Sequence, residues 1–171
     1  MFTIEEFTAK KEAIVKQQKE LQASLSDIFN KGIKELFEKY PNHLAQIYWV
    51  QYTPYFNDGD PCTFRRGEFY VNGQEAYDYG YDIPEIVDSL YTEEEIAIRN
   101  SWQLDPSNRW DYKNFNTGLS PERIKEFETV DDEVCKFLSL FSKDDYEFMF
   151  GDHIKVTITK DGISVDDYDH D

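Results

Sequence analysis

The segment from residue 44 to residue 64 restricts the possible folds more than any other part of the chain. Residues 44–53 are apolar on both faces of an extended chain, which predicts a well-buried strand. Residues 57–60, Asn-Asp-Gly-Asp, are typical of a tight turn, because these residue types tolerate positive φ angles or bond to their own backbone. Residues 62–66 and 68–72 have the composition of short strands. The sequence therefore predicts a strand–turn–strand unit at the centre of a sheet.

A long helix is predicted ahead of this unit. Thr3 and Glu6 form a capping box, and apolar residues then recur at helical spacing as far as Tyr40. The apolar stripe is thin over residues 8–20, so this half of the helix is expected to project from the body. Gly32 is expected to be a local weak point, because glycine is a poor helix former.

The rest of the chain alternates helices with turns and ends in a hairpin. Helix starts are predicted at Pro84, at the Thr92–Glu95 capping box, at Ser120-Pro121 and at Thr129, with Gly151 closing a helix over residues 130–150. Residues 156–165 alternate apolar and polar side chains around an Asp-Gly turn, which is a hairpin signal. The sequence thus predicts an α+β fold, an antiparallel sheet with helices packed on one face, built as a single domain over residues 1–171.

The net charge of −17 is distributed unevenly. Residues 1–42 form a charge-balanced N-terminal helix with seven acidic and seven basic residues, whereas residues 43–171 form an acidic body with 28 acidic and 11 basic residues. Such a body repels nucleic acid and anionic lipid, so neither direct nucleic-acid binding nor membrane binding is expected. It suits a partner protein with a basic surface, or it serves solubility alone. The thin stripe of the first helix adds self-association as a further alternative.

The composition also limits the compartment. A hydrophobic content of 40% and an aromatic content of 16% are enough to build a core. No apolar run approaches the ~20 residues of a membrane-spanning helix, and the first residues lack the pattern of a secretory signal. The two cysteines, Cys62 and Cys135, lie far apart, which predicts a reduced, cytosolic protein with both thiols in its core.

No familiar catalytic or nucleotide-binding motif occurs, and no enzyme activity is expected. The three histidines, His43, His153 and His170, have no sequence neighbours that indicate catalysis, so structural roles are expected for them. The acidic residues at 57–60 are too crowded for a calcium loop and favour a turn. A solvated tail is the interpretation of the C-terminal acidic cluster, which comprises Asp166, Asp167, Asp169, His170 and Asp171. We therefore expect neither a metal nor a cofactor.

Two groups of aromatic residues are candidates for contact with a partner. Tyr55 and Phe56, flanked by turn residues, belong either to the core or to a loop tip, where they would act as binding anchors. A second group interleaves tyrosines with acids in a segment expected to be irregular, and it comprises Tyr77, Asp78, Tyr79, Tyr81 and Asp82. Tyrosines on an acidic loop are suited to a basic protein surface. The exposure of Tyr55 and Phe56 decides between a scaffold and a binding tip.

The run from Trp49 to Cys62, W-V-Q-Y-T-P-Y-F-N-D-G-D-P-C, resembles a signature of small acidic proteins of tailed phages and some bacteria. Residues 150–156 and 168–171 are similar to the same proteins, so the likeness, with the N-terminal helix, covers most of the chain. The chain is also similar to the Pin family of T-even phage inhibitors of the host ATP-dependent protease Lon. The resemblance implies a host-takeover protein that acts by protein–protein contact in the host cell cytoplasm, and it carries over no catalytic residues.

These observations lead to one main functional hypothesis and three alternatives. The main hypothesis is a non-enzymatic acidic phage protein that binds and inhibits a host protein, in particular an ATP-dependent protease. The first alternative is a DNA mimic, since seventeen charges correspond to roughly 29 Å of duplex, but a mimic needs its acids in two ordered rows. The second alternative is a bacterial immunity protein against a basic toxin. The third is a metal-dependent enzyme that uses Asp58, Asp60 and His153. Only the residue types at these three positions support this alternative.

Overall fold

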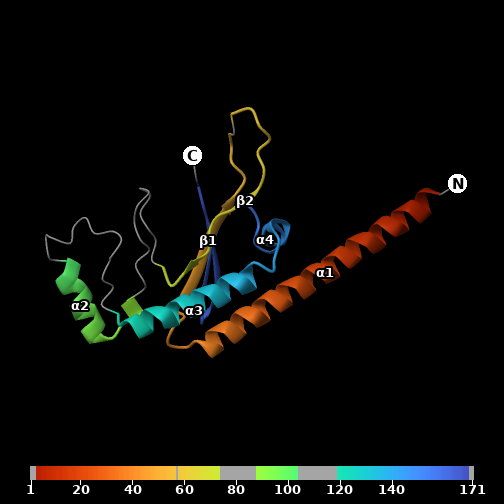
Figure 1. Ribbon diagram of the computed structural model, residues 1–171. Coiled ribbons are helices and arrows are strands. Elements are labelled where there is room, and N and C mark those ends of the chain that lie inside the picture. Colours follow the sequence, from red (N-terminus) through yellow and green to blue (C-terminus); the bar gives the residue numbers. More distant parts are fainter. Residues whose placement is uncertain (1–2, 57, 74–87, 104–118, 170–171) are drawn as a thin grey trace.

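In the part of the chain that the structure describes, the fold consists of a long helix, a five-stranded antiparallel sheet and three further α-helices (Figure 1). The computed structural model describes residues 3–56, 58–73, 88–103 and 119–169. The architecture is α+β, as the sequence predicts, with the long helix at the N-terminus.

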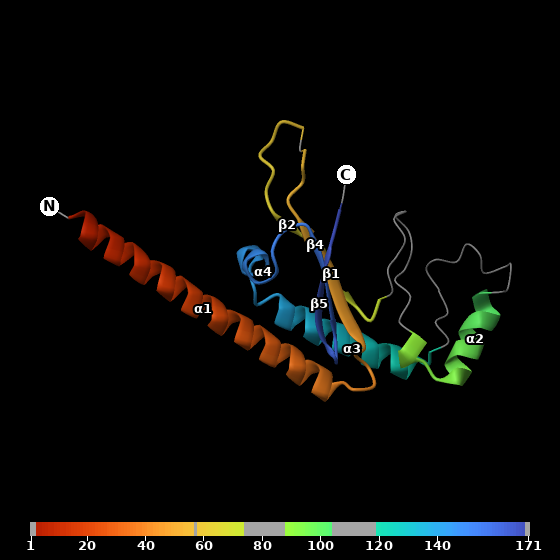
Figure 2. The same cartoon turned by 180° about the vertical axis from the view of Figure 1, so that it is seen from behind.

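Helix α1 (Ile4–Lys39) begins and ends as its sequence predicts. The Thr3 hydroxyl accepts a hydrogen bond from the Glu6 backbone N–H, the Glu6 side chain accepts one from the Thr3 backbone, and Tyr40 closes the helix. Residues 29–37 of α1 supply its buried side chains, whereas residues 3–21 are exposed. The exposed half extends well beyond the sheet in both views (Figures 1 and 2).

The sheet is built around β1 (Gln46–Tyr52). Along one edge of β1 runs β4 (Ile154–Thr159), with Trp49 opposite Val156, and β5 (Gly162–Asp167) pairs with the far side of β4. Two very short strands, β2 (Arg65–Arg66) and β3 (Tyr70–Val71), share the other edge of β1. The predicted strands at 62–66 and 68–72 are therefore present but shorter than expected.

The C-terminal helices differ from the prediction in where they break. Helix α3 (Pro121–Leu138) starts at the Ser120 cap and runs straight through Thr129, which the sequence had suggested as a new helix start. There the Thr129 hydroxyl donates to the Lys125 carbonyl within the helix. The break comes later, where Ser142 and the Asp145 side chain form a capping box that starts helix α4 (Lys143–Phe150).

A shorter pair of elements completes the described chain. A single 3₁₀ turn, η1 (Asp88–Leu90), precedes helix α2 (Glu93–Gln103), which begins at the predicted Thr92–Glu95 capping box. The Arg123 guanidinium of α3 donates to the Glu95 carboxylate at 3.0 Å and to the Leu90 carbonyl at 2.7 Å. These contacts hold η1 and α2 against the start of α3.

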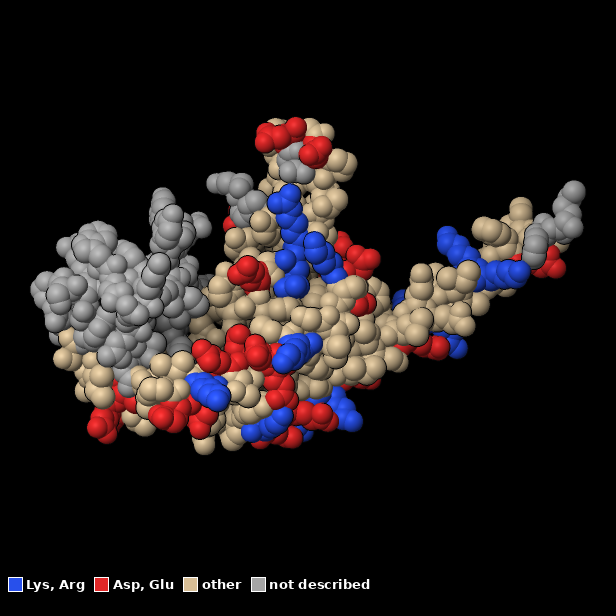
Figure 3. Space-filling model, in the orientation of Figure 1, with Lys and Arg blue, Asp and Glu red and all other residues tan. Residues whose placement is uncertain are grey.

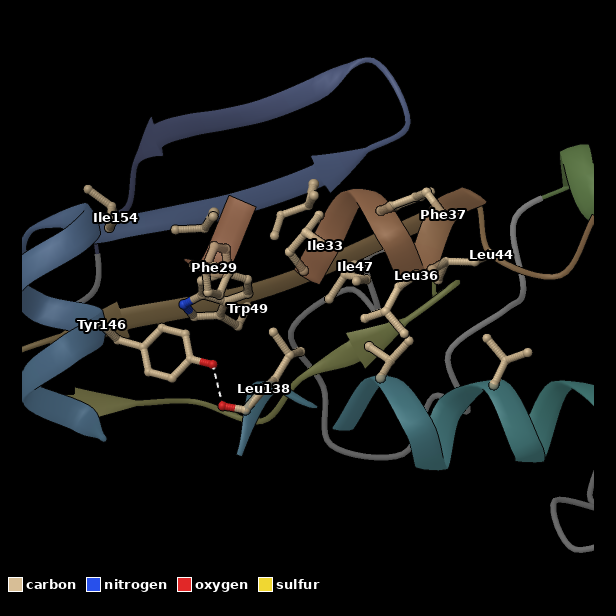
Figure 4. Packing of buried hydrophobic residues seen from close by; sticks show 14 residues of the cluster. Phe29, Ile33, Leu36, Phe37, Leu44, Ile47, Trp49, Leu138, Tyr146 and Ile154 are labelled. Atoms are coloured by element: carbon tan, nitrogen blue, oxygen red, sulfur yellow. Dashed lines mark hydrogen bonds between the residues drawn. The ribbon is translucent and has the colours of Figure 1, made fainter. Parts of the chain in front are cut away.

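The core lies between the sheet and helices α1, α3 and α4 (Figure 4). Trp49 and Tyr146 are its largest fully buried side chains, and Phe29 of α1 contacts the rings of Tyr146 and Phe150 edge-on. The Tyr146 hydroxyl donates to the Leu138 carbonyl at 2.6 Å, which joins α4 to the end of α3. Burial raises the pKa of Tyr146, so this phenol stays neutral and keeps its hydrogen bond.

One buried amide links three parts of this core. The Trp49 indole N–H donates to the Gln51 side-chain oxygen at 2.9 Å, and the Gln51 amide donates to the Tyr146 carbonyl at 3.1 Å and to the Gly151 carbonyl. Gln51 is fully buried, so each of these bonds replaces one to water that folding removed. The central strand is therefore joined to the middle of α4 and to the residue that caps its C-terminus.

Candidate binding surface

The connection between β1 and β2, residues 53–64, projects beyond the end of the sheet (Figure 1). We call it the β1–β2 loop. Pro54 is buried at its base, whereas Tyr55 is 67% exposed and Phe56 is 76% exposed. These two rings belong to the surface and not to the core. Large exposed aromatic side chains side by side are uncommon on a surface that only needs to stay soluble, and they are frequent at protein interfaces.

The base of this loop is anchored to the residues that precede β4. The Asp152 carboxylate accepts hydrogen bonds from the backbone N–H of Thr53 at 2.7 Å and from that of His153 at 2.8 Å. Burial raises the pKa of Asp152, but these hydrogen bonds outweigh it and hold the pKa below its usual value. Asp152 is therefore ionised at neutral pH and fixes the chain just before Tyr55.

The Tyr55 ring is positioned by a histidine. It stacks on His153, with ring centroids 4.7 Å apart and an interplanar angle of 26°. His153 has a φ of 55°, a left-handed conformation unusual for a residue other than glycine. Its Nδ1 lies 3.3 Å from the second Asp152 carboxylate oxygen. The buried Nε2 of His153 has no hydrogen-bond partner among the described residues. Tyr55 is thus presented on a fixed support while much of its surface stays open.

The far end of the loop is an acidic turn. Asp58 and Gly59 both have positive φ angles, 43° and 94°, as the turn prediction requires. Asp58 and Asp60 are exposed, and acidic side chains gather at the tip of the loop (Figure 3). The exposed Phe56 is thus followed in the sequence, two and four positions later, by the exposed carboxylates of Asp58 and Asp60. A surface that combines aromatic rings with carboxylates is complementary to one carrying Arg and Lys.

Asp58, Asp60 and His153 do not form a metal site. Among the residues that the structure describes, no three His, Cys, Asp or Glu side chains gather closely enough to hold a metal ion. His43, at the other end of β1, bonds through Nε2 to the Glu126 carboxylate at 3.0 Å. Each described histidine thus has a ring nitrogen close to a carboxylate, Asp152 for His153 and Glu126 for His43.

Tyr77, Asp78, Tyr79, Tyr81 and Asp82, like His170 and Asp171, lie outside the described residues. The expectation that both thiols lie in the core is wrong for Cys62, which is exposed on the β1–β2 loop. Cys135 is half-buried in α3, where burial raises the pKa of its thiol.

Sequence reasoning missed Asp152 as part of this surface, and it grouped His153 with Asp58 and Asp60 only as a candidate metal site and not as a support for Tyr55. Nothing local connects Asp152 and His153 with Thr53 and Tyr55, about a hundred positions earlier. The link follows only from the register of β1 and β4, in which Gln51 lies opposite Ile154. The hairpin signal at 156–165 predicts the pairing of β4 with β5, but the sequence offers no signal for the pairing of β1 with β4 or for its register.

A second exposed apolar surface lies on α1. We call it the α1 stripe and define it as Ile4, Phe7, Ile14, Leu21 and Ile28, which are between 56% and 82% exposed. The polar positions around it carry i,i+4 ion pairs such as Lys16–Glu20. The α1 stripe therefore resembles the contact face of an amphipathic helix whose partner is another chain.

An open groove of about 600 Å³ separates α1 from the turn between β4 and β5. Ile33, Phe37 and Ile163 provide its apolar lining, and Lys34 and Glu38 lie at its rim.

Charge on the face shown in Figure 3 is mixed rather than ordered. Acidic and basic side chains alternate along α1 and α3, where Lys39 pairs with Glu133 at 2.6 Å. This face does not carry the two continuous acidic rows that a DNA mimic needs. None of the described helices is both long and apolar enough to cross a bilayer. No protein-family model matches the chain, and comparisons with curated proteins and with solved structures found no significant similarity.

Proposed function

We propose that this protein acts by binding a basic surface of a host protein and inhibiting it, without catalysis of its own. The observation that carries the proposal is the β1–β2 loop, which presents Tyr55 and Phe56 next to Asp58 and Asp60 on an anchored base. Anchoring matters because a loop that is already ordered loses little conformational entropy on binding.

The specific target that we propose comes from the sequence resemblance and not from the geometry of the loop. Residues 49–62 resemble small acidic phage proteins, and the wider similarity is to inhibitors of the ATP-dependent protease Lon. The loop that carries this resemblance is the one that exposes its aromatic residues. A host ATP-dependent protease is therefore our specific candidate, with the acidic body favouring encounter with a basic patch.

The test begins with affinity capture from host lysate at low salt. The wild-type chain, a Tyr55→Ala/Phe56→Ala variant and a Leu140→Ala control are compared. Leu140 is 77% exposed but lies outside the loop, so the control removes exposed apolar area without changing the tip. We expect the wild type and the control to recover the same partner, and the loop variant to bind it at least about tenfold more weakly, as expected for anchor residues.

The second step measures inhibition directly. The purified host protease is given a protein substrate, and degradation is followed with and without the wild-type chain. Slower degradation with the wild type, but not with the loop variant, supports the inhibitor. Equal capture by the loop variant, or capture that does not weaken as salt is raised, would overturn the proposed surface.

A further inference from the structure

The α1 stripe has the spacing of a coiled-coil seam. Phe7, Ile14, Leu21 and Ile28 follow one another at intervals of seven residues, and the half-buried Leu25 lies with Ile4 on the adjoining line of the same face. In heptad terms the first four are d positions, and the a positions are Ile4, Lys11, Gln18 and Leu25. A seven-residue repeat sustained in this way favours a left-handed pair of helices.

This half of α1 has no support from its own body. Every described residue from 3 to 21 is exposed, including the apolar Ile4, Phe7 and Ile14. Helical segments of this kind gain most of their stability from packing an apolar face against something else. We therefore expect another surface to cover this row of large apolar side chains, which would otherwise be exposed to water.

Charge favours a second copy of the same helix as that occupant. Residues 1–28 carry five acidic and four basic residues, while residues 29–171 carry 30 acidic and 14 basic residues. Two copies of the nearly neutral segment meet with little repulsion. Two copies of the acidic body repel each other, so the pairing must keep the bodies apart.

The polar positions of the seam select the direction of pairing. In a parallel pair Lys11 would face Lys11 and Gln18 would face Gln18, which leaves two layers without an apolar side chain. In an antiparallel pair in which facing residue numbers sum to 32, Ile4 faces Ile28, Phe7 faces Leu25, Lys11 faces Leu21 and Ile14 faces Gln18. Every layer then contains an apolar residue, and the aliphatic stem of Lys11 can lie over Leu21 while its ammonium group reaches water.

We propose that two copies of this chain pair antiparallel through residues 4–28 of α1. The contact is isologous, as expected of a two-fold dimer, because each facing pair occurs twice. The 24 helical steps from residue 4 to residue 28 correspond to about 36 Å at 1.5 Å per residue, so the acidic bodies lie at opposite ends, several Debye lengths apart. The two β1–β2 loops are then presented as a divalent pair. The pairing does not depend on the partner proposed for those loops.

The first experiment measures mass in solution over a range of concentrations, by sedimentation equilibrium, on the full chain. We expect the wild type to approach twice its 20.3 kDa. Leu21→Glu places a charge in the seam and is expected to shift the chain to monomer. Ala23→Glu adds the same charge two residues away on the opposite face of the helix and is expected to leave the dimer intact. Both positions are exposed, so neither variant disturbs the core.

The second experiment determines direction by disulfide cross-linking in a Cys62→Ser background, which removes the exposed native thiol. An equal mixture of Ile4→Cys and Ile28→Cys chains is expected to give the mixed cross-linked dimer. Ile4→Cys alone is expected to give almost none, because residue 4 of one copy lies far from residue 4 of the other.

The outcomes separate the alternatives. A wild-type chain that stays monomeric throughout, or a dimer that Leu21→Glu does not weaken, overturns the proposal. Efficient cross-linking of Ile4→Cys with itself overturns the antiparallel direction. A monomer whose α1 stripe is needed instead for capture of another protein assigns that surface to a different partner and also overturns the proposal.

Discussion

Gly32 shows how one residue can have a role opposite to the one its type suggests. It is the single glycine of α1, and on propensity alone it weakens the helix. In the structure α1 is unbroken there, and a Cβ at this position would overlap the ring of Phe137 in α3. That ring is held by Phe29 and Phe141, with centroid distances of 6.1 Å and 5.5 Å. The missing side chain thus allows α1 and α3 to approach closely.

We therefore predict that Gly32→Ala destabilises the protein. Overpacking costs about 1–3 kcal/mol and exceeds the gain of about 1 kcal/mol in helix propensity. Urea unfolding measures the net loss. In a Phe137→Leu background the same substitution should cost less, because the smaller side chain vacates the space. A gain in stability from Gly32→Ala in the wild-type background would show that propensity outweighs packing here.

The Asp152 carboxylate at the base of the β1–β2 loop is expected to stabilise the folded protein more at neutral pH than at acidic pH. Its pKa is lowered in the folded protein, so its stabilising contribution is present above the unfolded value of about 4 and is lost as the pH falls through the folded value. The difference in unfolding free energy between wild type and Asp152→Asn should accordingly be constant near neutral pH and shrink below about pH 4. Urea unfolding across this range checks it, and a difference that does not change with pH contradicts the assigned cause.

At the scale of elements, the structure shows which sequence signals are reliable. The start of α1, the start of α2 and the β4–β5 hairpin were all predicted, because each depends on a few neighbouring residues such as Thr3 with Glu6. The break between α3 and α4 was misplaced. Thr129 and Asp132 have capping-box spacing, but burial of Val130 and Val134 keeps the helix continuous through them. Burial in the core thus determined that a helix starts at the capping pattern of Ser142 and not at that of Thr129.

The junction of α2 with α3 depends on one side chain. The side chains of Arg123 and Glu95 are only 25% and 15% exposed, and Arg123 also bonds the Leu90 carbonyl. Arg123→Ala leaves both acceptors without this donor and should release α2 locally. We expect amide exchange in residues 93–103 to quicken at least about tenfold, a loss of about 1.4 kcal/mol of local protection. Amides of β1 should not change.

Lys125→Ala is the matched control for that experiment. It removes one positive charge from the exposed side of the same helix, two residues from Arg123. We expect amide exchange in α2 to be unchanged in the Lys125→Ala variant. If both variants quicken exchange equally, charge alone and not the Arg123 contacts accounts for the effect.

At the scale of the whole molecule, the exposed half of α1 is separable from the stability of the body. Because residues 3–21 bury nothing in their own chain, deletion of residues 1–20 should leave the unfolding midpoint unchanged at low protein concentration. At high concentration the midpoint of the full chain should rise, since a dimer stabilises its folded state by mass action, while that of the shortened chain should not. Thermal unfolding over a concentration series tests this, and a midpoint that falls on deletion even in dilute solution would reveal a contact with the body.

The candidate surface was only partly predictable at this scale. Tyr55 and Phe56 stood out because aromatics between turn residues are unusual, and their exposure was the question that the sequence left open. The contacts of Asp152 and His153 with Thr53 and Tyr55 could not be predicted from the sequence, because they arise from strand pairing across a hundred residues. Local patterns thus identified which residues project, and long-range packing determined what holds them in place.

The same long-range pairing has a consequence for synthesis of the chain. β1 is the central strand, yet its longest partner, β4, begins at residue 154. Until that strand has been synthesised, β1 can pair only with the two-residue strands β2 and β3, and α1 has no completed sheet against which to bury Phe29. Contacts between residues so far apart in the sequence form slowly, because the entropy cost of closing the intervening loop comes before the stabilisation that the contacts provide. The complete sheet therefore forms only after β4 has been synthesised, and chains interrupted before residue 154 are expected to expose an incompletely paired central strand that chaperones and proteases recognise.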